Sequence, residues 1–191
     1  MIILASKSPR RRQLLSMMGL DFTVRTADID ETMDSAQTPA HETAAVCRRK
    51  AEKIAQDTAP GDVVIAADTI VVIGGKILGK PQDEEDAARM LRLLSGQTHT
   101  VYTGLCVICG AQVQTQVVAS EVTFRPLSGK EIRAYIKTGE PMDKAGAYGI
   151  QGYGAMFVSH LEGDYFSVMG LPVCTLSGML RAAGVPVLGQ L

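Results

Sequence analysis

The sequence predicts an α/β fold built on a mixed sheet. Short apolar runs of strand length, such as Val63–Ala67, alternate with helical patterns, such as Ala40–Asp57, as is typical of strands buried between helices. Thr98–Ile108 and Val113–Phe124 flank a glycine turn at Gly110 and predict a long antiparallel hairpin. Buried strands beside helices and a hairpin-rich half together indicate a mixed sheet.

The first strand and helix hold the most informative segment of the chain. Met1–Ala5 predicts a buried strand, Ser8-Pro9 predicts an N-cap followed by the first helical residue, and Gly19 ends the helix. Arg10-Arg11-Arg12 then falls in the first turn, where the helix dipole disfavours cations. Arginines and free N–H donors at a helix start suit a polyphosphate, so we favour an anion site here over arginines that extend into solvent or pair with acids.

The next elements lead to a candidate catalytic acid. A strand at Phe22–Arg25 and an acidic loop precede Thr38-Pro39, which predicts the start of the helix Ala40–Asp57. Asp68 follows the buried strand Val63–Ala67, and an isolated buried carboxylate needs a cation, a metal or strong hydrogen bonds. Asp68 is therefore a candidate for chemistry; the alternative is an aspartate that braces a loop through backbone N–H groups.

The strand continues through Ile70–Ile73 and turns at Gly74-Gly75, which is typical of a hairpin. The segment Gly74–Pro81 nearly matches a P-loop, but Pro81 replaces the Ser or Thr that would bind magnesium and no helix opens at Lys80. We therefore reject a P-loop. Lys80 remains a cation on the returning arm of the hairpin and is expected to share a cleft with Asp68; the alternative is a surface lysine.

The second half of the chain predicts helices, a strand and a glycine-rich loop. A helix capped by Asp83 ends before Gly96, a capping box at Ser128 starts a helix that ends at Gly139, Ala155–His160 forms a strand, and Leu171–Ala182 forms a helix. Asp143–Gly154 contains glycines that permit close backbone approach to a ligand, and Gln151 offers both a donor and an acceptor for a base edge. The alternative is a flexible surface loop.

Composition restricts the classes of function. The 191 residues are 46% hydrophobic and 20% charged, with a net charge of −1, so we expect one domain over 1–191 and no global attraction to nucleic acid or to an anionic membrane. Aromatic residues make up 5% and tryptophan is absent, which also disfavours a nucleic-acid binding module. With no apolar run of transmembrane length and no signal-peptide pattern, the expected location is the cytoplasm.

One cysteine motif needs a separate interpretation. Cys106 and Cys109 form a C-x-x-C without a second C-x-x-C or a histidine pair at zinc-site spacing. They lie in a predicted strand, where residues three apart point to opposite faces. We interpret them as small buried hydrophobes and not as a metal or redox site.

Short motifs along nearly the whole chain resemble the Maf (septum formation inhibitor) family. The matching segments, in chain order, are Ala5–Arg11, Asp30-Glu31, Lys50-Ala51, Ala67–Thr69, Gly79–Pro81, Ser95-Gly96, His99–Gly104, Asp143–Gly152 and Gly170–Pro172. Each motif alone is modest, but nine in order are highly specific. Ser167 is a departure, because the family commonly has asparagine there.

The resemblance implies an activity and a fold. Members are nucleoside triphosphate pyrophosphatases, and the loop Ala147–Gly152 looks like that of the branch that converts dTTP and UTP to the monophosphate and pyrophosphate. The implied fold is elongated, with two lobes that flank a central cleft, similar to the inosine triphosphate pyrophosphatases. A divalent metal, Mg²⁺ or Mn²⁺, and a homodimer are implied as well. The alternative is a non-catalytic nucleotide-binding regulator of cell division.

Site residues follow from the resemblance position by position. It implies Asp68 as the catalytic base, Arg11, Thr69 and Gln151 for substrate choice, and Glu31, Lys50 and Lys80 around the phosphates and the metal, so we assign catalysis to Asp68, Glu31, Lys50 and Lys80. From the residues themselves we add Ser8 and Arg10 to substrate binding and assign metal binding to Glu31 and Asp68. The charges are consistent with this, because clustered cations would compensate a triphosphate while carboxylates hold magnesium. Which acid is base and which is metal ligand stays open. The expectation is that these distant residues converge on one groove.

Overall fold

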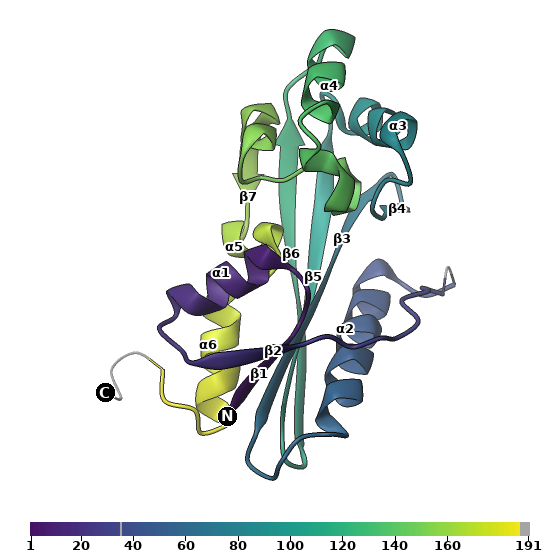
Figure 1. Cartoon of the computed structure of the whole chain (residues 1–191). Coiled ribbons are helices and arrows are strands. Elements are labelled where there is room, and N and C mark those ends of the chain that lie inside the picture. The colour runs from purple at the N-terminus through teal and green to yellow at the C-terminus, as the bar shows by residue number, and fades with distance from the viewer. Residues whose placement is uncertain (35, 188–191) are drawn as a thin grey trace. The chain divides into compact units, whose positions relative to one another are not determined.

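Seven strands form one mixed sheet in the order β2-β1-β3-β5-β6-β7, with β4 paired to β3 (Figure 1). The computed structural model describes residues 1–34 and 36–187. The strands are β1 (Ile2–Ala5), β2 (Phe22–Arg25), β3 (Val63–Ile73), β4 (Lys76–Leu78), β5 (Thr98–Cys109), β6 (Gln112–Phe124) and β7 (Val158–Glu162). The mixed α/β class predicted from the sequence is confirmed.

Helices and short 3-10 turns connect the strands. The α-helices are α1 (Pro9–Met17), α2 (Pro39–Ala55), α3 (Glu84–Leu94), α4 (Gly129–Ile136), α5 (Tyr165–Met169) and α6 (Val173–Ala182). The 3-10 turns are η1 (Glu140–Asp143), η2 (Ala145–Ala147) and η3 (Tyr153–Phe157). Among these described helices, none is both long and apolar enough to cross a membrane.

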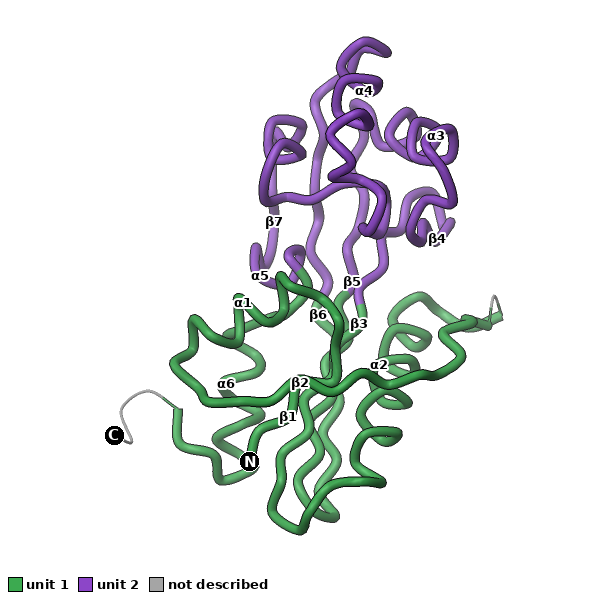
Figure 2. The backbone as a smooth tube through the Cα atoms, viewed as in Figure 1, with its two compact units in different colours: residues 1–68, 103–118, 170–191 green, residues 69–102, 119–169 purple. Residues whose placement is uncertain are grey.

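The chain divides into two compact units (Figure 2). Unit 1 comprises Met1–Asp68, Thr103–Val118 and the chain from Gly170 onward, and unit 2 comprises Thr69–Tyr102 and Ala119–Met169. The single domain over 1–191, the elongated shape and the central cleft stay predictions.

Unit 1 is built around parallel strands. β1 pairs in parallel with β2 and with β3, so that Leu4 lies beside both Val24 and Ile65. Helix α2 covers one face of these strands, while α1 and α6 lie on the other (Figure 1). The face toward α2 buries Ile3, Val64 and other apolar side chains almost completely, because a parallel sheet with helices on both faces leaves little of its strands in water.

Close packing of α2 against β5 depends on one glycine. A Cβ atom built at Gly104 would lie 2.6 Å from the carbonyl oxygen of Thr43 and 3.0 Å from Sγ of Cys47. No side chain fits at that distance, so Gly104 permits the approach that brings α2 onto the sheet.

Unit 2 contains the hairpins. β3 and β4 pair antiparallel, with Ile73 opposite Lys76, and both turn residues between them, Gly74 and Gly75, have positive φ. This turn geometry favours glycine at both positions and confirms the hairpin that argued against a P-loop. Helix α4 begins with the predicted capping box, in which Ser128 and Glu131 bond each other's backbone N–H.

The structure differs from the sequence-based elements mainly between residues 140 and 170. The strand expected at Ala155–His160 is β7, which starts at Val158, because Tyr153–Phe157 forms the 3-10 turn η3 instead. The loop expected at Asp143–Gly154 contains η2, and the short helix α5 was not predicted. Short 3-10 turns and one-turn helices carry too few periodic apolar positions to show in a sequence pattern.

Candidate functional site

A cluster of charged side chains lies between α2 and β3 in unit 1. The ammonium Nζ of Lys50 is 2.7 Å from Oδ1 of Asp68 and 3.1 Å from Oε1 of Glu31. Lys50 and Asp68 are both buried, at 8% exposure each, whereas the Glu31 side chain is 57% exposed. Together with Arg11 we call these residues the charged cluster. Asp68 therefore has the cation that a buried carboxylate requires.

Helix and strand periodicity explain how Lys50 meets Asp68. Ala66 packs in the apolar core with Cys47 and Ile54 of α2, and strand alternation places Asp68 on the same face as Ala66. Lys50 comes three residues after Cys47 and four before Ile54, so it lies on the side of α2 that faces the sheet. The ion pair forms where this apolar core ends.

The arginine turn at the start of α1 is organised by two serines and a carbonyl. The side chain of Ser8 caps α1 by accepting from the N–H of Arg11, and Oγ of Ser6 accepts from the N–H of Ser8. The Arg11 guanidinium donates through Nε to the carbonyl of Gly170 at 2.8 Å and through Nη1 to Ser6. Arg11 is thus fixed toward the interior. The sequence pattern did not indicate Ser6, although it stands inside the first matching motif.

Electrostatic coupling joins Arg11 to the cluster. Burial lowers the pKa of the Arg11 guanidinium, while the charges of Asp68 and Glu31 raise it and that of Arg10 lowers it. Arginine stays protonated under any such shift, so Arg11 places a permanent positive charge near Asp68. Arg10 is half-buried and Arg12 is exposed, so the solvent alternative holds for Arg12.

The loop that carries Glu31 is fastened to α2 at two further points. The buried carboxylate of Glu42 accepts from the backbone N–H of Asp34 at 2.8 Å, and Nη2 of Arg49 donates to the carbonyl of Thr32 at 3.2 Å. With the Lys50 contact, three contacts hold this loop against one helix. The sequence analysis did not identify Glu42 and Arg49. An acidic residue in the first turn of a helix is common at the surface, so the sequence alone did not show that Glu42 is buried.

Two buried cysteines near the charged cluster are not activated thiols. Cys47 is fully buried, and burial, followed by the nearby Cys106 and Asp68, raises its pKa to about 12. Cys106 is buried on β5 and burial raises its pKa as well, while Cys109 is half-buried. The surroundings of Cys106 are typical of a structural cysteine and agree with its interpretation as a buried hydrophobe, whereas Cys109 is less buried than expected.

Three of the predicted site residues lie in unit 2. Thr69, the residue after Asp68, is half-buried on β3, Lys80 is exposed after β4, and Gln151 is half-buried before η3. The N–H of Gly146 donates to the carbonyl of Gly79 at 3.0 Å, which brings the glycine-rich segment beside the residue that precedes Lys80. Convergence of these three residues with the charged cluster stays a prediction.

Unit 2 also contains polar residues that sequence reasoning missed. Glu140 accepts hydrogen bonds from Tyr135 and from two backbone N–H groups of the glycine-rich segment. Nε2 of His99 lies 2.8 Å from the hydroxyl of Tyr148, and both side chains are buried. Both residues stand in segments that resemble the family, His99 in His99–Gly104 and Tyr148 in Asp143–Gly152. That position in the motifs could have indicated the pair from the sequence.

Ser167, the departure from the family pattern, lies on α5. Its side chain is fully buried, and its backbone N–H donates to Oδ1 of Asp164 at 3.2 Å. The position is therefore inside unit 2 in the middle of a short helix, and nothing in the structure explains why serine replaces asparagine.

The charged cluster offers oxygen ligands of the kind that magnesium prefers. Glu31 and Asp68 lie near each other, because Oε1 of Glu31 and Oδ1 of Asp68 contact the same Lys50 nitrogen at 3.1 and 2.7 Å. Within residues 1–34 and 36–187 no group of three or more His, Cys, Asp and Glu side chains is arranged to hold a metal ion. Two carboxylates fit Mg²⁺ nonetheless, because this ion keeps several waters and takes further oxygens from substrate phosphates.

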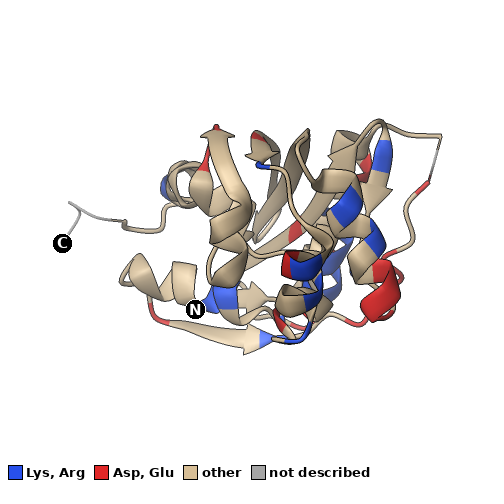
Figure 3. Ribbon diagram, turned by 90° about the horizontal axis from the view of Figure 1, so that it is seen from above, with Lys and Arg blue, Asp and Glu red and all other residues tan. Residues whose placement is uncertain are grey.

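Charged residues of both signs also occur elsewhere in the chain. Figure 3 shows Lys and Arg in blue and Asp and Glu in red on several helices and strands. Their near balance gives the net charge of −1.

Sequence comparison identifies the family of the chain. The profile of the family described as "Maf: Maf-like protein" matches residues 1–183. A relative from Anaeromyxobacter dehalogenans (strain 2CP-C) is 49% identical, covering 97% of this chain and 95% of its own length. One from Pelotomaculum thermopropionicum is 49% identical with 98% of both covered, and one from Bacillus pumilus is 47% identical with 96% and 97% covered. All three are named dTTP/UTP pyrophosphatase.

Solved structures show more distant similarity. The Staphylococcus aureus Ham1 protein gives a TM-score of 0.48 at 13% identity, covering 95% of this chain and 98% of its own. A dITP/XTP pyrophosphatase from Mycobacterium abscessus gives 0.41 at 12% identity, with 97% of both chains covered. Both TM-scores are below 0.5, so the assignment depends on the sequence relatives. On the match to residues 1–183 and on relatives at nearly half identity, the chain belongs to the Maf-like protein family.

Proposed function

We propose that this protein hydrolyses dTTP and UTP to the corresponding monophosphate and pyrophosphate. Relatives at 47–49% identity over nearly the full chain bear the name dTTP/UTP pyrophosphatase. The observation that carries the proposal is the contact of one buried ammonium with two carboxylates, Lys50 with Asp68 and Glu31, beside the fixed guanidinium of Arg11. Acids for water activation and cations for phosphate are then present in one cluster.

The proposed reaction is attack of water on the α-phosphorus. The water oxygen bonds to that phosphorus, the bond to the oxygen bridging the α- and β-phosphorus breaks, and pyrophosphate leaves with the bridging oxygen. Lys50 contacts Oδ1 of Asp68, and we assign the other oxygen, Oδ2, as the acceptor of the water's proton. Lys50 orients this carboxylate, because its ammonium contacts Oδ1 at 2.7 Å.

In this proposal both Arg11 and the divalent metal compensate the negative charge of the substrate phosphates. We assign the Arg11 guanidinium, which Gly170 and Ser6 orient, to a phosphate oxygen of the substrate, with Ser8 and Arg10 beside it. Glu31 and Asp68 would hold Mg²⁺ or Mn²⁺, which when bound supplies neutralisation of phosphate charge. We assign Lys80 to the phosphates, and Thr69 and Gln151 to the choice of base.

The test is direct product analysis. Purified protein with MgCl₂ and dTTP or UTP should release pyrophosphate and the monophosphate without orthophosphate, and EDTA in excess of the metal should stop the release. Absence of hydrolysis across all common nucleoside triphosphates would refute the proposal. A non-catalytic regulator would instead bind nucleotide tightly without turnover, in the wild type and in Asp68→Ala alike.

We also propose that the protein is a cytoplasmic homodimer, as the family resemblance implies. Light scattering coupled to size-exclusion chromatography should give twice the 20.4 kDa mass of the chain. A monomer at micromolar concentration would refute this part alone.

A further inference from the structure

The segment Gly149–Gly154 in unit 2, which we call the Gln151 loop, has a backbone that few other sequences could adopt. Gly152 has φ +88° and ψ −148°, a conformation essentially confined to glycine, and a Cβ built there would lie 2.7 Å from Oε2 of Glu140. A Cβ at Gly154 would lie 2.3 Å from the carbonyl oxygen of Gly149. Both glycines are therefore required by sterics, and the loop doubles back on itself.

The Glu140 carboxylate closes this loop through three accepted hydrogen bonds. Its Oε1 accepts from the hydroxyl of Tyr135 at 2.9 Å and from the N–H of Gly154 at 3.1 Å. Its Oε2 accepts from the N–H of Tyr153 at 3.0 Å. The missing Cβ of Gly152 is what lets the carboxylate reach these N–H groups.

Tyr135 fastens the other end of the loop. Its buried hydroxyl donates to Glu140 and accepts from the N–H of Gly149 at 3.2 Å, so one side chain joins the carboxylate to the start of the loop. Burial raises the pKa of Tyr135, which keeps the hydroxyl protonated as a donor.

Lys144 supports the same arrangement from the glycine-rich segment. Its Nζ donates to the carbonyl of Glu140 at 2.6 Å and to Oδ1 of Asp143 at 2.7 Å. A Cβ at Gly149 would meet Cε of Lys144 at 2.8 Å, so the lysine stem lies directly against the loop. The first and last residues of the loop thus each contact a fixed polar side chain, and Gln151 lies between them.

We propose that Glu140 is the positioning residue that fixes the Gln151 loop for recognition of the pyrimidine base; this inference rests on the proposed function. A site discriminates strongly between bases only when its hydrogen-bonding groups are held in place before the ligand arrives. Glycine-only backbone conformations persist where the surroundings over-determine them, and they gather at ligand-binding loops. Glu140 holds the loop in this conformation through its hydrogen bonds and does not itself contact the base.

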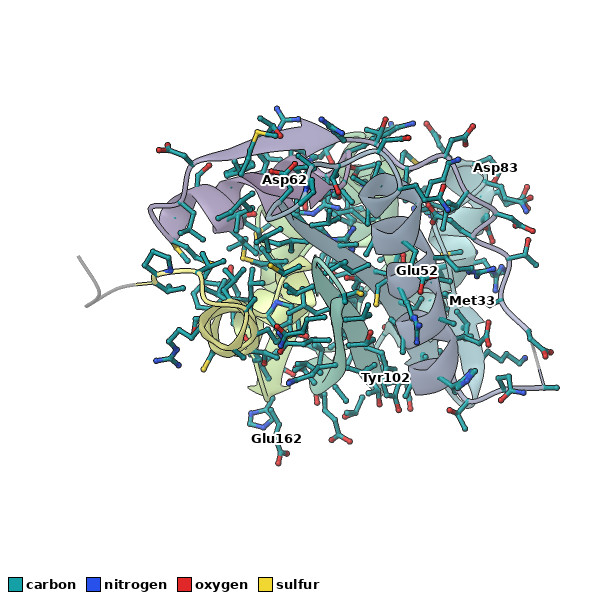
Figure 4. All side chains as sticks on the ribbon, turned by 90° about the horizontal axis from the view of Figure 1, so that it is seen from below. Met33, Glu52, Asp62, Asp83, Tyr102 and Glu162 are labelled. Carbon is teal, nitrogen blue, oxygen red and sulfur yellow. The ribbon has the colours of Figure 1, made fainter. Side chains whose placement is uncertain are left out.

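The sharpest variant is Glu140→Gln. The amide keeps one oxygen as an acceptor but places an NH₂ group where Oε2 accepts from Tyr153, so a donor then faces a donor. We expect the ratio of kcat/KM for UTP over GTP to fall about tenfold, through a raised KM for UTP, with kcat for UTP nearly unchanged. The matched control is Glu162→Gln: Glu162 projects away from β7 and is exposed (Figure 4).

A second variant decides the question if Glu140→Gln does not fold. Tyr135→Phe removes only the hydroxyl oxygen that joins Glu140 to Gly149. It should also lower the ratio of kcat/KM for UTP over GTP. The control is Tyr165→Phe, on a residue that is 40% exposed. A wild-type UTP-to-GTP ratio in folded Tyr135→Phe overturns the inference, whereas a lost ratio at unchanged kcat supports it.

Failure of the inference differs visibly from failure of the proposed function. A wild-type protein that releases no pyrophosphate from any nucleotide refutes the proposed function, and equilibrium binding of UMP and GMP to the wild type and to Tyr135→Phe then tests the inference. If the variant binds both with the wild-type preference, Glu140 and Tyr135 serve folding alone and the inference is overturned.

Discussion

The two units use polar side chains in opposite ways. In unit 1, Lys50, Asp68 and Glu31 meet as full charges, and the central pair is buried. In unit 2, a single carboxylate, Glu140, organises neutral backbone N–H groups beside packed aromatic rings, among which Tyr148 lies 4.7 Å from Phe124 between centroids. The difference indicates that unit 1 is built to stabilise charge and unit 2 to hold a shape.

The largest effect is expected at the acid of unit 1. Asp68→Asn keeps the size of the side chain but removes the proton acceptor, so kcat for dTTP should fall about 10⁴-fold. Pyrophosphate release measures this, and Asp57→Asn, on an exposed aspartate that follows α2, should leave kcat unchanged. If Asp68→Asn kept most of its turnover, another residue would have to accept the proton of the water. The functional difference between the two units would then be unsupported.

The next effect tests how far unit 1 depends on its ion pair for stability. Lys50→Met leaves the buried carboxylate of Asp68 without its cation, which should lower the free energy of unfolding by about 4 kcal/mol. Urea denaturation measures this loss. In the double variant Lys50→Met, Asp68→Asn, the uncompensated charge is gone and much of the stability should return; an equally unstable double variant would mean that packing, not charge, accounts for the loss.

A pH test probes the polar interior of unit 2. Burial lowers the pKa of His99 to about 4, below its ordinary value of 6.5. Between these two pH values His99 is protonated in the unfolded chain and neutral in the folded protein. Stability should therefore fall as the pH drops from about 6.5 to about 4, by at most about 3 kcal/mol.

Thermal unfolding of the wild type and of His99→Gln across this pH range measures the effect. The variant should lose this contribution to the slope, whereas His160→Gln, on an exposed histidine of β7, should keep the wild-type slope. Identical slopes in all three proteins would show that His99 is not held neutral by its surroundings.

The smallest effect is expected at Gln151 in unit 2, and it tests whether the two units have separate functions. Gln151→Ala should change the ratio of kcat/KM for UTP over GTP about tenfold while kcat for UTP stays close to wild type, because an amide that reads a base edge does not touch the water. Steady-state kinetics with both nucleotides measure it. A fall in kcat with an unchanged ratio would place Gln151 with the charged cluster in function and remove the distinction between the units.

Local signals predicted local structure well. Ser8, Thr38, Asp83 and Ser128 were each predicted as helix starts, and in each case the side chain accepts a backbone N–H three residues later. A cap depends on residues within one turn, so the short-range sequence contains all that determines it. The β7 boundary was placed too early for the opposite reason, since the 3-10 turn before it is held by Glu140, far outside any local window.

The candidate site was predictable in part. Asp68 was predicted as a buried carboxylate that needs a partner, although it lies in the middle of β3 and not after a strand that ends at Ala67. The arginine turn was predicted from cations where a helix disfavours them. Glu42 and Arg49, which fasten the Glu31 loop, could not be predicted, because their partners are backbone groups of Asp34 and Thr32 that any sequence would offer.

By itself the sequence determined the starts of α1, α2, α3 and α4, the glycine turns, the mixed character of the sheet and, through nine ordered motifs, the family. Tertiary structure alone decided that Lys50 joins Asp68 to Glu31 and that Glu140 closes the Gln151 loop. The physical reason is range. Caps and turns satisfy hydrogen bonds within a few residues, whereas these contacts depend on how closely a helix packs on a sheet, as Gly104 permits, and on backbone groups that no side-chain pattern reveals.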